Sequence, residues 1–131
     1  MTNKIHPVSI VGAGPGDPEL LTLKAARLIG EADVVVFDRL ISEEIMAMVP
    51  AGAMRVYAGK SAHNHHMSQD DINELLVKLA KSGRKVLRLK GGDPFTFARG
   101  GEEALYLAQN GIPFEIVPGI TAATSVTAYA G

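Results

Sequence analysis

The stretch from Val8 to Asp17, VSIVGAGPGD, decides the fold class of this chain. Its first four residues are a β-rich run, closed by Gly12, that predicts a strand. The six residues from Gly12 to Asp17 contain three glycines and a proline, which is typical of a loop. After the loop, Leu20, Leu23, Leu28 and Ile29 predict a helix with one buried side. A strand, a glycine-rich loop and a helix in this order indicate the start of an α/β fold.

The same order repeats along the rest of the chain. The uninterrupted apolar run from Asp33 to Phe37 is typical of a strand covered on both faces. Further strands are predicted at residues 55–57, 85–89 and 114–117. Helices are predicted from Ser42, from Ser68 to about Lys81, from Gly101 to Asn110 and from Thr121. Strands that alternate with helices predict an open parallel sheet with helices on both faces.

Length and composition narrow the class of protein. The 131 residues suit one domain, residues 1–131, and an apolar content of 47% suits a packed core. The absence of cysteine excludes disulfides, thiolate zinc sites and a catalytic thiol. A net charge of -1 argues against a nucleic-acid-binding module. No apolar run reaches the length of a membrane span and no signal peptide is recognisable, so we expect a cytoplasmic protein.

The last predicted helix, from Thr121, has little chain after it. We therefore expect the chain to be one domain of something longer. The alternative is a complete chain that dimerises through this end.

In an open parallel sheet, ligands bind beyond the carboxyl ends of the strands. The segments that follow the predicted strands are Gly12–Asp17, Asp38-Arg39, Gly59-Lys60, Lys90–Pro94 and Pro118–Thr121. Four of the five contain glycine, which lets backbone groups approach a ligand closely. Each segment alone is ordinary turn chemistry, but together at one edge they predict a ligand site.

The first loop does not fit a dinucleotide. The Rossmann fingerprint G-x-G-x-x-G would need glycine where this chain has Asp17. Pro15 also removes an N–H donor that a pyrophosphate would use, and Asp17 adds a negative charge. Asp38 would suit a ribose hydroxyl, or it is a simple turn residue. The pattern favours an adenosyl ligand without phosphate over NAD.

Several motifs, considered together, resemble those of the tetrapyrrole methylases, and among them the enzymes that methylate uroporphyrinogen III. The resemblance covers about residues 8–131. Ser61 departs from the pattern because an Arg is common there, and Ala98 stands where Gly or Ser is usual. The matching motifs are VGAGPGD (11–17), VFDRL (36–40), GK (59–60), QDDIN (69–73), RLKGGDPF (88–95), RGGEE (99–103) and VPGITAA (117–123).

The resemblance implies a five-stranded parallel sheet in the order 3-2-4-1-5. It implies the N-terminal half of a two-domain, homodimeric enzyme, with the second domain absent from this chain and the isolated domain weakly active or inactive. The reaction would transfer methyl groups from S-adenosylmethionine to carbons 2 and 7 of uroporphyrinogen III, giving precorrin-2. The implied catalytic residues are Asp38 as proton acceptor and Lys60 as proton donor. The implied cofactor contacts are Pro15, Gly91, Gly92, Asp93, Thr96, Thr121 and Ala122.

A tetrapyrrole with a rim of acetates and propionates needs cations at the mouth of its site. Arg39, Lys90 and Arg99 follow predicted strands and are candidates for binding these carboxylates. The acidic residues Glu102 and Glu103, among others, are placed on predicted helices, so the near-zero net charge conceals this basic cluster.

One histidine-rich segment has to be interpreted, and two alternative functions stay open. His63, His65 and His66 lack metal-ligand spacing, so we expect a polar loop and no metal site. The chain could act on another tetrapyrrole or resemble diphthine synthase. It could also be a non-catalytic ligand-binding or interaction module.

Overall fold

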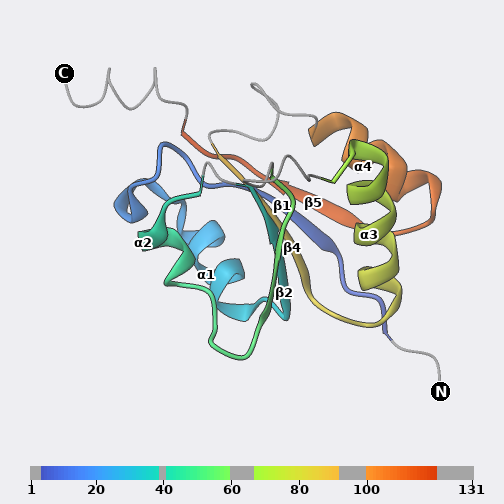
Figure 1. Cartoon of the computed structure of the whole chain (residues 1–131), viewed down its shortest axis with the longest axis horizontal. Coiled ribbons are helices and arrows are strands. Elements are labelled where there is room, and N and C mark those ends of the chain that lie inside the picture. Colours follow the sequence, from blue (N-terminus) through green and yellow to red (C-terminus); the bar gives the residue numbers. More distant parts are fainter. Residues whose placement is uncertain (1–3, 39–40, 60–66, 92–99, 121–131) are drawn as a thin grey trace.

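The five predicted strands form one parallel sheet, in the order β3-β2-β4-β1-β5. The computed structural model describes residues 4–38, 41–59, 67–91 and 100–120. The order confirms the topology implied by the family resemblance. Because all pairs are parallel, every strand ends at the same edge of the sheet, toward the top of Figure 1. The strands are β1 (Val8–Gly12), β2 (Val34–Phe37), β3 (Met54–Tyr57), β4 (Val86–Lys90) and β5 (Phe114–Val117).

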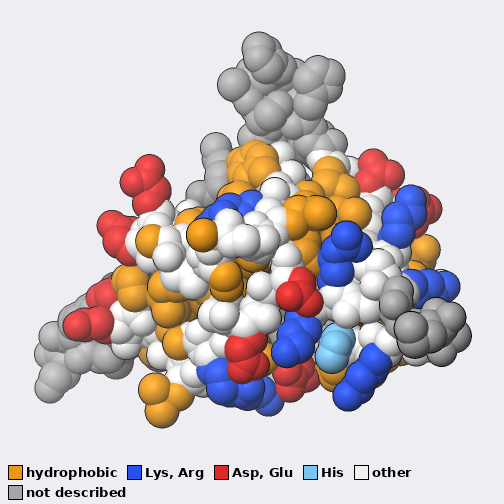
Figure 2. Space-filling model, turned by 90° about the horizontal axis from the view of Figure 1, so that it is seen from below, with side chains coloured by type: hydrophobic (Ala, Val, Ile, Leu, Met, Phe, Trp, Pro, Cys, Tyr) orange, Lys and Arg blue, Asp and Glu red, His pale blue; other side chains and the backbone are white. Residues whose placement is uncertain are grey.

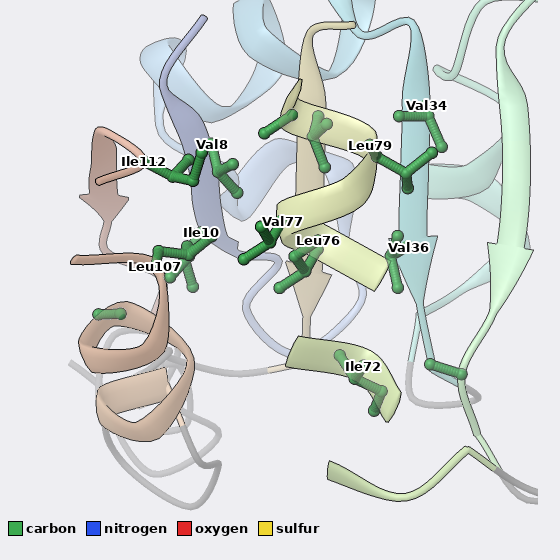
Figure 3. Close-up of a cluster of buried hydrophobic side chains, with 14 residues drawn as sticks. Val8, Ile10, Val34, Val36, Ile72, Leu76, Val77, Leu79, Leu107 and Ile112 are labelled. Atoms are coloured by element: carbon green, nitrogen blue, oxygen red, sulfur yellow. The ribbon is translucent and has the colours of Figure 1, made fainter. Parts of the chain in front are cut away.

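Helices cover both faces of the sheet, as the alternation of elements predicts (Figure 1). One face packs against α1 (Leu23–Glu31) and α2 (Glu43–Met46), and the other against α3 (Gln69–Lys81) and α4 (Gly100–Gln109). Consecutive residues of a strand point to opposite faces, so Leu87 and Leu89 join the α1 side while Val86 joins the α3 side. Figure 3 shows this cluster, in which Leu76, Val77 and Leu79 of α3 lie among strand residues such as Ile10 and Val34.

The first helix begins later than the apolar spacing predicts. Residues Pro18–Leu20 form a short 3-10 helix, whose N-cap Asp17 accepts a hydrogen bond from the Glu19 N–H at 2.9 Å. Thr22 then caps α1, its hydroxyl accepting from the Ala25 N–H at 3.0 Å. Because the second helix begins only after Thr22, the Leu23 side chain points outward and is 92% exposed, while Ala25 and Ile29 lie in the core. The predicted buried side of this helix was therefore wrong at Leu23.

Ser68, from which the sequence predicts this helix, is the N-cap of α3. The Ser68 hydroxyl accepts a hydrogen bond from the Asp71 N–H at 3.1 Å, and Gly83 follows the helix with φ +87. Within α3, Leu75 is only half-buried, while the polar Asn73 is buried. The helix predicted from Thr121 lies outside the described residues. Within the described ranges, no helix is long and apolar enough to cross a membrane.

Candidate active site

The carboxyl edge of the sheet gathers the residues that follow the strands. Gly12 is in register with Lys90, and Phe37 with Leu89. Asp38, one position beyond Phe37, is therefore level with Lys90 on the neighbouring strand. The edge is closed by backbone bonds from the Ala13 N–H to the Lys90 carbonyl and from the Ala58 N–H to the Phe37 carbonyl, each 2.7 Å.

The loop after β1 is held in a shape that needs its glycines. Gly14 has φ +67, and a side chain there would meet the Ile120 carbonyl oxygen at 3.4 Å. Gly16 has φ +111, and its carbonyl accepts a hydrogen bond from the Ser42 hydroxyl at 2.6 Å. The same Ser42 oxygen accepts from the Ile45 N–H at 3.3 Å, so one side chain fixes the loop and caps α2. Pro15, at the tip between the two glycines, is exposed.

Asp38 and Lys90 share the face of the sheet that packs against α3 and α4. Asp38 continues the alternation of Val34 and Val36, which lie in that core layer. It is half-buried, at the boundary between the core and the outside. Arg88 and Lys90 continue the alternation of Val86 on β4 and are both buried. The sheet thus brings a carboxylate and two cations together at its carboxyl edge.

A second carboxylate reaches these cations from α4. Glu103 is fully buried, and its Oε2 accepts a hydrogen bond from Arg88 Nε at 2.9 Å. Lys90 Nζ lies 3.2 Å from Glu103 Oε1, an ion-pair contact. Glu103 Oε1 has no aligned hydrogen-bond donor among the described residues, so this contact is ionic in character. We call Asp38, Arg88, Lys90 and Glu103 the charged cluster.

Polar side chains of α3 extend the charged cluster. Gln69 Nε2 donates to Glu103 Oε2 at 3.1 Å and lies 2.9 Å from Asn73 Oδ1. Arg88 Nη1 donates to the Val36 carbonyl at 3.3 Å, which ties β4 to β2. The network therefore links two central strands to both helices on one face.

Burial lowers the pKa of the Lys90 ammonium from its usual 10.5, because removal from water disfavours the charged form. The carboxylate of Glu103 opposes this shift, Arg88 adds to it, and Asp38 opposes it more weakly. Lys90 is thus electrostatically coupled to charges on β2, β4 and α4.

The structure describes only part of the predicted site. Asp38, Lys90, Pro15 and Gly91 all lie at the carboxyl edge, Gly91 directly after β4 and half-buried. Lys90, predicted to bind substrate carboxylates, is only 3% exposed and its ammonium meets Glu103. The other residues predicted for the site lie outside the described residues. They are the predicted proton donor Lys60, the predicted cofactor contacts Gly92, Asp93, Thr96, Thr121 and Ala122, and the predicted substrate-binding residues Arg39 and Arg99.

Sequence reasoning missed the role of Glu103, which it placed among the acidic residues of predicted helices. A signal for it was present on β4. Arg88 and Lys90 stand two apart in a central strand, so both point to one covered face and need a counter-charge there. Glu103 meets that need from the first turn of α4.

No group of three or more His, Cys, Asp or Glu side chains could hold a metal ion within the described ranges. The predicted polar loop with His63, His65 and His66 lies outside these ranges.

A hollow of about 150 Å³ lies at the opposite end of the sheet, where the strands begin. Its lining includes His6, Glu31, Lys85 and Glu115. Figure 2 shows that side of the molecule, with lysine or arginine side chains around a histidine and acidic side chains beside them. It is far from the loops that a parallel sheet uses for ligands, so we assign the candidate site to the carboxyl edge.

Comparisons with known proteins show the family of the chain. A family model described as Tetrapyrrole (Corrin/Porphyrin) Methylases matches residues 7–131. Siroheme synthase of Nitrosospira multiformis is 63% identical over 124 residues, which are 95% of this chain and 26% of that protein. Siroheme synthase of Methylobacillus flagellatus is 60% identical over 95% of this chain and 27% of its own length. The chain thus spans about a quarter of these curated relatives.

Two solved structures have the same fold. The crystal structure of uroporphyrin-III C-methyl transferase from Thermus thermophilus, complexed with S-adenyl homocysteine, is 49% identical with a TM-score of 0.82. That match covers 93% of this chain and 52% of the other. Cobalt precorrin-4 methyltransferase, a cobalamin biosynthetic enzyme, is 32% identical with a TM-score of 0.83, over 95% of this chain and 50% of the other.

Proposed function

Because the chain belongs to the tetrapyrrole (corrin/porphyrin) methylases, we propose that it supplies one wall of an S-adenosylmethionine-dependent methyltransferase site. The substrate is uroporphyrinogen III, methylated at carbons 2 and 7 to give precorrin-2 on the route to sirohaem and cobalamin. The observation that carries this proposal is the 49% identity to a uroporphyrin-III C-methyl transferase whose crystal structure contains S-adenyl homocysteine.

The loop after β1 fits an adenosyl ligand that has no phosphate. Gly14 and Gly16 keep the backbone bare of side chains at this edge, so a flat ligand could approach closely. Pro15 offers no N–H, and the Asp17 carboxylate caps a helix in the same loop. A negative charge there suits a positive sulfonium ligand and disfavours a pyrophosphate. The residues present therefore fit S-adenosylmethionine better than NAD.

The residues that would hold this cofactor are Pro15, Gly91, Gly92, Asp93, Thr96, Thr121 and Ala122. When bound, the cofactor supplies an electrophilic methyl group on a sulfonium centre. A pyrrole carbon is already electron-rich, so the protein chiefly has to align the two reactants and exclude water. The bare glycine backbone of the carboxyl edge suits that task.

Asp38 is the proposed proton acceptor. Its half-buried carboxylate stands at the end of β2, within the edge where the substrate ring would lie. After methylation, a C–H bond of the ring system breaks, its electron pair returns to the macrocycle, and the proton passes to the Asp38 carboxylate. Lys60 is the proposed donor of a proton. Arg39 and Arg99 would bind substrate carboxylates, with Lys90 adding positive charge from inside the wall.

The solved relatives are about twice as long as this chain. We propose that a second domain completes the cleft and that the enzyme is a cytoplasmic homodimer, with no nucleic acid or membrane as partner. Methyl transfer needs both reactants in close contact and shielded from water. The 131-residue chain alone would therefore fold but transfer methyl groups weakly or not at all.

Transfer of radiolabelled methyl from S-adenosylmethionine to uroporphyrinogen III, by the complete protein that carries this sequence, tests the proposal. Precorrin-2 is the expected product. Cofactor binding without transfer, or transfer only to cobalt precorrins, would favour the reaction named for the precorrin-4 relative. The matched variant is Asp38→Asn, which should keep cofactor affinity and lose turnover. Loss of cofactor binding with unchanged single-turnover transfer would contradict the role of Asp38.

A further inference from the structure

The charged cluster contains two cations and two carboxylates, all on one face of the sheet. Arg88 and Lys90 come from β4, Glu103 from α4, and Asp38 from the residue after β2. In adjacent parallel strands, residues at the same level lie about 5 Å apart. Since Phe37 pairs with Leu89, Asp38 and Lys90 are such neighbours. Lys90 therefore stands between a carboxylate on the next strand and a carboxylate on the helix.

The members of the charged cluster differ in their access to water. The side chains of Arg88, Lys90 and Glu103 are 5%, 3% and 0% exposed. Asp38 alone is half-buried. Among the four, only Asp38 is exposed enough to contact a substrate. The other three can influence the reaction only through Asp38 or through the stability of the fold. Buried charges cost free energy unless they are paired. Even a paired set is often no more stable than well-packed apolar residues, so stability alone is a weak reason for burying one here.

The ammonium of Lys90 has a defined set of neighbours. Asp38 faces it from β2, Arg88 from its own strand and Glu103 from α4. Gln69 and Asn73 of α3 are uncharged and bind Glu103 or each other, so they hold the carboxylate without adding charge. Burial favours loss of the proton from the Lys90 ammonium, and the Glu103 carboxylate opposes that loss.

On the basis of the proposed function, we infer that Lys90 is the internal counter-charge of Asp38 and that Glu103 is the positioning residue that keeps Lys90 beside it. The Lys90 ammonium supplies positive charge beside the Asp38 carboxylate, which is to accept the substrate proton. Glu103 keeps Lys90 charged and fixed in place. When Asp38 accepts the proton, Lys90 and Glu103 stay an ion pair, and the carboxylate can release the proton to water afterwards. Neither residue touches the substrate.

The first experiment follows the pH profile of single-turnover methyl transfer in the complete protein. Lys90→Met should move the acidic limb upward by about one pH unit, which lowers turnover about tenfold near that limb. Lys90→Arg, which keeps a permanent positive charge, should leave the acidic limb in place. Glu103→Gln, which removes the ion pair that fixes Lys90 in place, should move the acidic limb in the same direction as Lys90→Met but by less. A merely structural role would reduce the rate equally at every pH, and that result would overturn the inference.

A second experiment does not depend on the reaction. NMR titration of the Lys90 side chain in the 131-residue chain, labelled on lysine, measures its pKa in wild type, Asp38→Asn and Glu103→Gln. Loss of either carboxylate should lower the pKa, more for Glu103→Gln. An unchanged Lys90 pKa in Asp38→Asn would overturn the pairing. If the Glu103→Gln variant does not fold, the Asp38→Asn variant alone still tests the pairing, because Asp38 is only half-buried. Failure of the proposed function would appear separately, as a Lys90 pKa that shifts in a protein without uroporphyrinogen methylation.

Discussion

Glu103 and Glu115 are two carboxylates at opposite ends of the sheet, and each contacts a lysine and at least one further polar side chain. Glu103 contacts Lys90 and Arg88 at the carboxyl end and is fully buried. Glu115 contacts Lys24 at 2.9 Å and the Ser9 hydroxyl at 3.2 Å, and it lines the hollow at the amino end, with a side chain 34% exposed. The contact distances are similar, but the surroundings are not.

The comparison of the two ends shows how burial changes the contribution of an ion pair to stability. An exposed pair gives up little hydration and gains little, so it contributes less than about 1 kcal/mol. A buried set forfeits its hydration, so breaking it leaves an uncompensated charge inside the protein. The carboxyl-end set should therefore be the more sensitive of the two to the loss of one partner.

The largest effect is expected when the buried carboxylate is removed. Glu103→Leu leaves Arg88 without its buried counter-charge and Lys90 with Asp38 alone. The free energy of unfolding should fall by about 3–5 kcal/mol. Urea denaturation measures this loss. The matched control is Glu102→Leu, the exposed neighbour on the same helix, which should stay within about 0.5 kcal/mol of wild type.

A triple variant separates stability from chemistry at the same place. Replacement of Arg88, Lys90 and Glu103 together by Met, Met and Leu removes the whole buried set and should restore most of that stability. The pH profile of methyl transfer should keep the displaced acidic limb expected for Lys90→Met. A triple variant as unstable as Glu103→Leu would show that packing, and not the unpaired charge, explains the loss.

Much of the fold could be predicted from the sequence because local patterns carry it. The β-rich run at Val8, the apolar run before Phe37 and the helix start at Ser68 each led to an element that the structure confirms. The strand order came from the family resemblance and not from the patterns. The start of α1 could not be predicted from apolar spacing, because Asp17 and Thr22 cap two separate short helices there.

The candidate site was harder to predict, since it depends on contacts between distant parts of the chain. Asp38 and Gly91 were identified from their positions after strands, a rule that needs only the order of elements. The burial of Glu103 depends on which turn of α4 faces β4, and the sequence does not specify that contact. Only the pair of cations on a central strand indicated that a counter-charge had to exist.

A smaller effect is expected from the glycine loop at the carboxyl end. Gly14→Ala puts a side chain on a residue with φ +67, 3.4 Å from the Ile120 carbonyl oxygen. The left-handed backbone should lower stability by about 1–2 kcal/mol, and S-adenosylmethionine affinity should fall more than stability alone explains. The control is Gly30→Ala in α1, where nothing lies within 4 Å, which should raise stability by about 0.5–1 kcal/mol. Thermal unfolding and calorimetric titration measure both. Equal cofactor affinity in the two variants would exclude the loop from the cofactor site.

Two serines that cap helices provide a further comparison, since loss of either cap should lower stability by about 1 kcal/mol. Ser42→Ala and Ser68→Ala both remove a hydroxyl that accepts from a helix N–H. Only Ser42 also donates to the Gly16 carbonyl, at the carboxyl edge. We therefore expect similar losses of stability but a loss of cofactor affinity for Ser42→Ala alone. Equal affinities would show that the Gly16 contact does not shape the cofactor site.

The smallest effect is expected at the amino end, and it has a definite pH dependence. The hydrogen bond from Lys24, supported by the Ser9 hydroxyl, holds the pKa of Glu115 below its usual 4.5. A carboxyl whose folded-state pKa is depressed binds fewer protons in the folded state than in the unfolded one. Its contribution is therefore complete above pH 4.5 and is lost as the pH falls through the folded-state value. Glu115→Gln should lower stability by less than about 1 kcal/mol at pH 7, and by less at pH 3 than at pH 7. Lys24→Met should give part of the same effect, because the Ser9 contact stays. Urea denaturation at the two pH values measures it, and an equal loss at both would mean that Glu115 acts by packing and not by its charge.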